Sequence, residues 1–109
     1  MYIINRRFEW DDAKEDSNRL KHGLSFEEAV TAFNDERAFE REDVKHSTPL
    51  ERRYLLVGEM DPQVLALKHR FISIVFTRAD DVFRIISARP ASRKERELYA
   101  KKQTAFENH

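Results

Sequence analysis

Stretches rich in strand-forming residues lie at the start and in the second half of the chain. Residues 2–10 contain Tyr, Ile, Phe and Trp, which favour extended backbone. Residues 52–59, 70–78 and 82–89 have the composition of strands, and two of these stretches are apolar on both faces, as covered central strands are. Residues 36–43 are highly charged and suit an edge strand. The pattern therefore predicts a sheet built mostly from late segments of the chain.

Three predicted helices begin with the same local signal, a short polar side chain three residues before a glutamate. In a capping box, these two side chains bind backbone N–H groups at the start of the helix. The pairs are Ser25 with Glu28, Ser92 with Glu95 and, as a close variant, Asp12 with Glu15. The first helix is expected to end near His22, because Gly23 suits the left-handed conformation that terminates helices. The third is expected to begin after Pro90 and to run to about Lys102.

The second predicted helix has one apolar face, because Phe26, Ala29, Val30 and Phe33 recur at helical spacing. The resulting order is strand, two helices, strands and a final helix. Connections between the late strands are too short for parallel crossovers. We therefore expect an α+β fold, in which a mostly antiparallel sheet packs with two N-terminal helices and one C-terminal helix. A length of 109 residues suits a single domain over residues 1–109.

Polar and proline-containing segments separate the predicted strands. Residues 44–51 indicate a loop, and Asp61-Pro62 and Ala79-Asp80-Asp81 are typical of turns. Residues 64–67 either extend a strand or fill a loop.

Composition narrows the class of protein. The chain has no cysteine, so it has neither a disulfide framework nor a thiolate metal site. It has no apolar run of the roughly 20 residues that span a membrane, and no signal segment at its start. Twenty basic side chains balance twenty acidic ones. We therefore predict a folded, soluble, cytoplasmic protein with no membrane association.

Charge is distributed unevenly along the chain. Residues 27–43 carry seven acidic against two basic side chains, and residues 84–102 carry seven basic against two acidic ones. The basic segment is suited to phosphate groups, since arginine offers paired donors. A solvated helix with ordinary salt bridges is the other interpretation of the same pattern.

The candidate chemistry is electrostatic. None of the four histidines has metal-ligand spacing to another, and the two glycines make no phosphate-binding loop, so we predict no metal and no cofactor. Arg84 and Arg89 are the first candidates for stabilising a charged transition state. Five positions separate them, so on a regular strand they face opposite ways. Both reach one site only if the strand ends or bulges near Pro90.

Several motifs, in order along the chain, resemble those of the BrnT toxins. They are Phe8-Glu-Trp-Asp11, Lys21-His-Gly-Leu-Ser-Phe-Glu-Glu-Ala29, Phe33-Asn-Asp35, Arg53-Tyr54 with Gly58, Thr77, Arg84-Ile-Ile-Ser-Ala-Arg89, and Pro90-Ala-Ser-Arg-Lys-Glu95 with Tyr99. Each is short, but the first long motif followed by the Arg84–Arg89 motif is specific. The resemblance covers about residues 8–99.

This resemblance implies a RelE-like fold and a type II toxin. Such a toxin is an endoribonuclease that cleaves RNA and inhibits translation without a metal. The resemblance also implies a BrnA-like ribbon-helix-helix antitoxin, which neutralises the toxin and through which the complex binds operator DNA.

The resemblance and the chemistry of the side chains together give candidate site residues. The expected catalytic residues are Lys21, Arg53, Arg84, Arg89 and Tyr99. The expected substrate-binding residues are Trp10, His22, Arg78 and Arg93. Structural roles are open for several of them: Lys21 suits the end of a helix, Trp10 suits packing on the first helix, and Tyr99 suits the core.

One departure from the family pattern leaves two other functions open. The family places an arginine two residues after the strand threonine, whereas Thr77-Arg78-Ala79 has it one residue early, on the other strand face. The chain is then a catalytically inactive toxin-fold module that acts with its antitoxin in operator repression. A plain nucleic-acid-binding domain that uses residues 84–102 is the second alternative.

Overall fold

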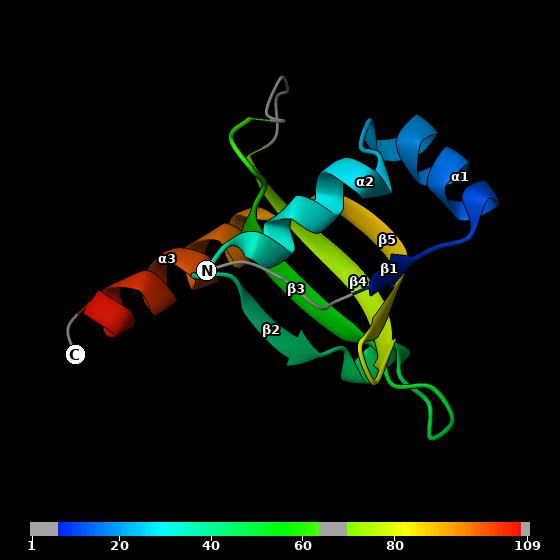
Figure 1. Cartoon of the computed structure of the whole chain (residues 1–109). Coiled ribbons are helices and arrows are strands. Elements are labelled where there is room, and N and C mark those ends of the chain that lie inside the picture. Colours follow the sequence, from blue (N-terminus) through cyan, green and yellow to red (C-terminus); the bar gives the residue numbers. More distant parts are fainter. Residues whose placement is uncertain (1–6, 64–69, 108–109) are drawn as a thin grey trace.

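The computed structural model describes residues 7–63 and 70–107, with side chains as far as Lys102 in the last helix. Within these residues the strands are β1 (Arg7–Glu9), β2 (Phe39–Glu42), β3 (Tyr54–Glu59), β4 (Phe71–Ala79) and β5 (Val82–Pro90). They form one sheet in the order β1-β5-β4-β3-β2 (Figure 1). The prediction of an α+β fold is confirmed, and the charged segment forms the edge strand β2 as predicted.

The sheet is mixed rather than wholly antiparallel. The pairs β2–β3, β3–β4 and β4–β5 are antiparallel, as the short connections predicted. Strand β1, however, pairs parallel with β5, in the register Glu9 to Arg84. The chain between these strands passes through the helices and the other strands, so no local signal predicts this pairing. The RelE-like likeness stays a prediction.

Helix boundaries follow the local signals, with three corrections, the first being that the last helix extends past its predicted end near Lys102. The long helices are α1 (Asp12–His22) and α3 (Arg93–Glu107). Gly23 ends α1 with φ of 71°, as predicted. The N-cap of α1 is Asp11 and not Asp12, because Asp11 accepts the N–H of Ala13. The second helix, α2 (Phe26–Ala29), is only one turn long and continues as the 3-10 helix η1 (Val30–Asn34).

Both serine capping boxes are present. Ser25 accepts the N–H of Glu28 while the Glu28 carboxylate accepts the N–H of Ser25. At the start of α3 the same exchange joins Ser92 and Glu95. These reciprocal bonds satisfy N–H groups that lack partners within the helix.

Each face of the sheet has its own core. The larger core lies beneath α2 and η1 and includes the fully buried Phe26, Ile74 and Phe76. Helix α3 lies on the other face of the sheet (Figure 1). Its Tyr99 forms a smaller core with Phe39, Leu55 and Val57. Residues on adjacent strand positions alternate between the two cores, as a pleated sheet requires.

Gly58 in β3 permits η1 to approach the sheet closely. A Cβ atom at Gly58 would lie 2.9 Å from the Ala38 Cβ and 3.2 Å from the Ala32 carbonyl oxygen. Because both distances are shorter than ordinary contacts, the backbone of η1 packs on β3 with no side chain between them.

A bulge in β5 changes which residues share a face. Val75 pairs with Ser87, but Phe76 pairs with Ile85, so Ile86 is an extra residue in β5. An extra residue shifts the alternation of all later positions. Arg84 and Arg89 therefore lie on the same face, the one that α3 partly covers. The bulge that the sequence analysis named as a condition for a shared site is therefore present.

The remaining connections are short. Segment 44–51 contains the 3-10 turn η2 (Val44–His46), and Asp80 occupies the turn between β4 and β5 with φ of 55°. The alternative left open for residues 64–67 lies outside the described residues. Within the described ranges no helix is long and apolar enough to cross a membrane.

Candidate functional site

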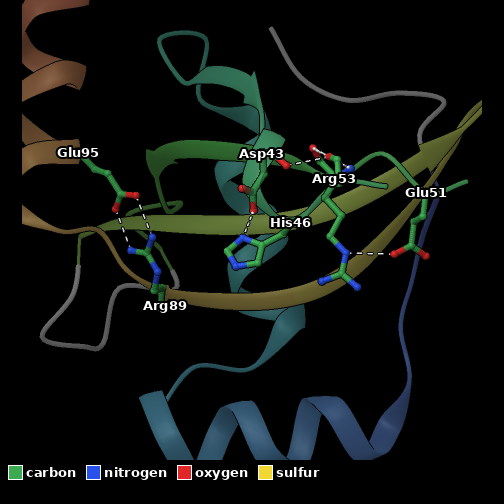
Figure 2. Close-up of polar contacts among 7 residues, drawn as sticks. Asp43, His46, Glu51, Arg53, Arg89 and Glu95 are labelled. Carbon is green, nitrogen blue, oxygen red and sulfur yellow. Dashed lines mark hydrogen bonds and ion pairs between the residues drawn. The ribbon is translucent and has the colours of Figure 1, made fainter. Parts of the chain in front are cut away.

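A groove of about 560 Å³ lies beside the start of α3, on the face of the sheet that carries the smaller core. Its floor comes from β3, β4 and β5, through Leu55, Val75, Ile86 and Ser87. The segment from β2 to η2 forms one side. The start of α3 and the end of β5 form the other side. The groove therefore brings together residues that lie far apart in the sequence (Figure 2).

His46 and Asp43 form a hydrogen-bonded pair in this groove. His46 Nδ1 lies 2.9 Å from Asp43 Oδ2, and the histidine side chain is 60% exposed. In the tautomer that carries its proton on Nδ1, His46 donates this proton to Asp43, and Nε2 keeps its lone pair. The pair is thus an oriented imidazole, which is suited to proton transfer.

Hydrogen bonds to β3 fix the turn that carries this pair. The Asp43 N–H donates to the Arg53 carbonyl at 2.7 Å. The Ser47 hydroxyl donates to the Asp43 carbonyl and accepts the Arg53 N–H, each at 2.8 Å. These contacts hold η2 against the sheet, so His46 and Arg53 keep a fixed relation to each other.

Arg53 extends into the groove from the residue before β3. Its Nε lies 3.0 Å from Glu51 Oε1, and its side chain is 32% exposed. In Figure 2, His46 lies between Arg53 and Arg89. Among the described residues the structure shows no ion pair from the two Nη groups of Arg53. A phosphate in the groove would therefore find these donors available.

Arg89 and Glu95 form a bidentate ion pair at the other side of the groove. The Nη1–Oε1 and Nη2–Oε2 distances are both 2.8 Å. Glu95 Oε1 also accepts the Ser73 hydroxyl at 2.7 Å and the Ser92 N–H at 2.8 Å. Burial alone would raise the pKa of Glu95, but these hydrogen bonds outweigh it and hold the pKa at about 2. The same pair raises the pKa of Arg89, which stays charged.

The electrostatics of the groove favour an anionic ligand. Its basic side chains are Arg41, Lys45, His46, Arg53 and Arg89. Of its acidic side chains, Asp43 orients His46, Glu95 binds Arg89, and Glu42 pairs with Arg52 at 3.3 Å. The arrangement can hold a phosphate beside an oriented base.

Three of the five predicted arginines lie outside this groove, and two of these three are in strands. Arg84 shares the groove face but pairs with Glu9 at 3.0 Å, near the far end of β5. Four residues of strand rise separate it from Arg89, which is roughly 13 Å. Arg78 lies on the opposite face, where it binds Glu40 and lies 4.2 Å from the centroid of the Tyr54 ring. Of the predicted arginines, the structure thus places Arg53 and Arg89 in the groove, which Arg41 of β2 also lines.

The two predicted aromatic site residues pack in the cores. Tyr99 is 7% exposed, its ring centroid lies 5.0 Å from that of Phe71, and its hydroxyl donates to Asp35 Oδ2 at 2.7 Å. Burial and Asp35 raise the pKa of Tyr99, so the hydroxyl keeps its proton. Trp10 packs edge-on against Phe26, at 5.8 Å between centroids. Both contacts are those of structural residues.

The remaining predicted residues lie on the two long helices. Lys21 and His22, at the end of α1, line a second hollow that also includes Ser87 and Arg89. Arg93, in the first turn of α3, is 87% exposed and contacts Glu97 at 3.4 Å. Lys21 and His22 are therefore neighbours of the groove, and Arg93 lines neither hollow.

Sequence reasoning missed His46 and Asp43 as a pair. A local signal was present, because Asp43 and His46 are three residues apart in a polar segment, and this spacing brings side chains together in a helical turn. From the sequence, Glu95 was predicted only as part of the capping box of the last helix. Its pairing with Arg89 depends on the bulge in β5, which the sequence pattern does not show.

No group of three or more His, Asp or Glu side chains that could hold a metal ion occurs among residues 7–63 and 70–107.

Residues 10–95 match a family model described as "Ribonuclease toxin, BrnT, of type II toxin-antitoxin system". The match includes strands β2 to β5, helices α1 and α2 and the first turn of α3, but not β1. It includes the whole groove. A comparison with curated proteins gives no match.

Proposed function

Because the chain belongs to the BrnT family of ribonuclease toxins of type II toxin–antitoxin systems, we propose that its groove is the site of a metal-independent endoribonuclease. The observation that carries this proposal is the Asp43–His46 pair flanked by Arg53 and Arg89. An oriented base next to phosphate-binding donors is what cleavage of RNA by its own 2′-hydroxyl requires.

In the proposed reaction, Nε2 of His46 takes the proton of the 2′-hydroxyl. The 2′-oxygen then forms a bond to phosphorus, and the bond from phosphorus to the 5′-oxygen breaks. Arg53 stabilises the negative charge that develops on the phosphoryl oxygens. The departing 5′-oxygen takes up a proton, which water in this open groove supplies. The products are a 2′,3′-cyclic phosphate and a 5′-hydroxyl.

Arg89 has a role of its own in this scheme, which is to present a fixed positive charge. Its two Nη groups bind Glu95, so the guanidinium is held in one orientation at the side of the groove. A fixed guanidinium requires little reorganisation when charge develops nearby. We assign Tyr99 and Trp10 to the cores, and Arg78 and Arg84 to surface ion pairs.

The partner follows from the family. Type II systems pair each toxin with a protein antitoxin. We propose a BrnA-like ribbon-helix-helix antitoxin that covers the groove and links the complex to operator DNA. RNA cleavage by the free toxin in the cytoplasm would inhibit translation.

One observation favours a second candidate function. Arg78 lies on the face opposite the groove, bound to Glu40 and stacked on Tyr54. If the chemistry needs the family's arginine in this strand, the chain is an inactive toxin-fold module that acts only with its antitoxin in operator repression.

Cleavage by the purified protein distinguishes these functions. Labelled RNA is incubated with the wild type and with H46A, each with and without ribosomes and with excess chelator. The proposal predicts that the wild type cleaves RNA and that excess chelator does not stop the reaction. H46A should cleave little RNA under the same conditions. Absence of cleavage by folded wild type, combined with antitoxin-dependent operator binding, would establish the second function instead.

A further inference from the structure

Helix α1 packs on the sheet through a polar face. Helices that cover a sheet usually bury an apolar stripe. Among residues 12–22, however, Asn18 is the one buried side chain, whereas Leu20 is 90% exposed. Lys14, Asn18 and Lys21 recur at helical spacing and line the side of α1 that faces β5. The composition of this face is not explained by packing.

Asn18 ties this face of α1 to β5 and to the segment after α1 by side-chain hydrogen bonds. Its Oδ1 accepts the Ala88 N–H at 3.1 Å, and its Nδ2 donates to the Leu24 carbonyl at 3.3 Å. The residues of α1 around Asn18, Lys14, Ser17 and Lys21, face a space between the helix and β5. A hollow of about 360 Å³ remains between the two elements.

This hollow adjoins the groove. Ile86, Ser87 and Arg89 line both of them. Ile86 is the extra residue of the bulge, so the irregular part of β5 forms the ridge at which the two spaces meet. A single strand that lies in the groove can therefore cross β5 and continue beneath α1.

Every ionisable side chain that lines the hollow is basic. They are Lys14, Lys21, His22 and Arg89. The groove, by contrast, also contains acidic side chains. Most arginines of the described surface have a carboxylate partner, but the structure shows no ion pair for Lys14 or Lys21 within the described ranges. Two unpaired cations over a polar floor suit a polyanion.

We propose that the hollow beneath α1 binds backbone phosphates of the RNA strand on one side of the scissile linkage. Lys14 and Lys21 are then phosphate-binding residues that set the length of RNA the protein engages. This inference rests on the proposed function, since it extends the same substrate beyond the groove. It gives Lys21 a binding role in place of a catalytic one.

A binding experiment tests this inference without cleavage. A fluorescent octanucleotide of 2′-O-methyl RNA cannot be cleaved through its 2′-oxygen, and its affinity for the full chain is measured over a range of salt. Each phosphate contact contributes about 0.7 to the slope of log K against log salt for a single strand. K14Q and K21Q are each expected to lower the slope by about 0.7 and to weaken binding roughly five- to tenfold at low salt.

R19Q is the matched control. Arg19 is an exposed cation on the same helix, but it lines neither the hollow nor the groove. It should keep the wild-type slope. Thermal melting of all three variants confirms that α1 remains folded.

A cleavage arm then separates long from short substrates. K14Q should reduce the advantage in kcat/KM that an octanucleotide has over a dinucleotide, because a dinucleotide does not reach the hollow. Wild-type slopes for both K14Q and K21Q would overturn the inference. The inference would also be overturned if K14Q and K21Q lost affinity for the antitoxin but kept wild-type affinity for RNA, because the lysines would then bind the partner protein. If the wild type cleaves no RNA, the proposed function fails, yet the binding arm still decides the role of the lysines.

Discussion

Glu95 binds both Nη groups of Arg89, with two N–O distances of 2.8 Å. This contact joins the first turn of α3 to the end of β5, and the Ser73 hydroxyl adds β4 to the same carboxylate. One side chain therefore caps a helix, pairs a charge and fixes one side of the groove.

Stability should depend on Glu95 in a pH-dependent way. Its pKa is about 2 in the folded chain, below the 4.5 of a free glutamate, so the folded state favours the ionised form. The resulting stabilisation, on the order of 3 kcal/mol, is complete above pH 4.5 and is lost as the pH falls toward 2. Urea unfolding of the wild type and E95Q should show a large difference at pH 7 that shrinks below pH 4.

E97Q is the control for this prediction. Glu97 is 66% exposed and pairs only with the exposed Arg93 among the described residues, so its substitution should change stability little at any pH. A difference between the wild type and E95Q that stays constant from pH 7 to pH 3 would contradict the assignment.

H46A should lower the rate of RNA cleavage by about 10²–10⁴-fold, because the proposed base is lost. D43N should lower it less, since the ring remains but its orientation is no longer fixed by a carboxylate. Added imidazole should restore part of the activity of H46A and none of that of D43N. Full activity of folded H46A would remove His46 from the mechanism.

Replacement of Arg53 by alanine should cost about 10²-fold or more in kcat, as for a lost donor to the transition state. Arg89→Ala leaves the buried Glu95 unpaired and is expected to destabilise the fold, so R89A/E95Q is the variant to assay. Single-turnover cleavage at saturating RNA measures the effect. Unchanged activity in both folded arginine variants would refute their role.

The ends of the products report the chemistry. Attack by the 2′-hydroxyl should leave a 2′,3′-cyclic phosphate, or its opened 3′-phosphate, and a 5′-hydroxyl. The reaction should continue in excess chelator. Chelator-sensitive cleavage that leaves 5′-phosphate ends would instead indicate a metal-activated water.

Y99F should act on stability. The Tyr99 hydroxyl donates to Asp35 in a partly buried contact, and loss of such a hydrogen bond costs about 1 kcal/mol. The midpoint of urea unfolding should fall accordingly. A hundredfold loss of kcat with unchanged unfolding would return Tyr99 to the catalytic residues.

Local features of this chain were predictable from its sequence. The capping boxes at Ser25 and Ser92, the end of α1 at Gly23 and the edge strand β2 all depend on residues within one or two turns of each other. The α+β class follows from their order. Asp11 replaced Asp12 as the first cap because adjacent aspartates offer equivalent oxygens, and only the entry angle of the chain distinguishes them.

Features that depend on distant contacts were not predictable. The parallel pairing of β1 with β5 joins residues about 75 positions apart. The bulge at Ile86 leaves no mark in a strand that is apolar on both faces, yet it decides that Arg84 and Arg89 share a face. Of the candidate arginines, Arg53 and Arg89 line the groove. His46 was not among the candidates, because its spacing to Asp43 indicates a pair but not that the pair lies beside these arginines.

The parallel pairing of β1 with β5 also sets the order in which the protein can assemble during synthesis. The first strand and the helices after it leave the ribosome early, but the strand on which they dock is among the last segments made. Contacts between distant segments form late, because the intervening chain must be present first. The groove needs residues up to Glu95, so a nascent chain has no assembled groove until most of it has emerged. If the groove is the nuclease site, as proposed, that site is therefore incomplete while the ribosome is still making most of the chain.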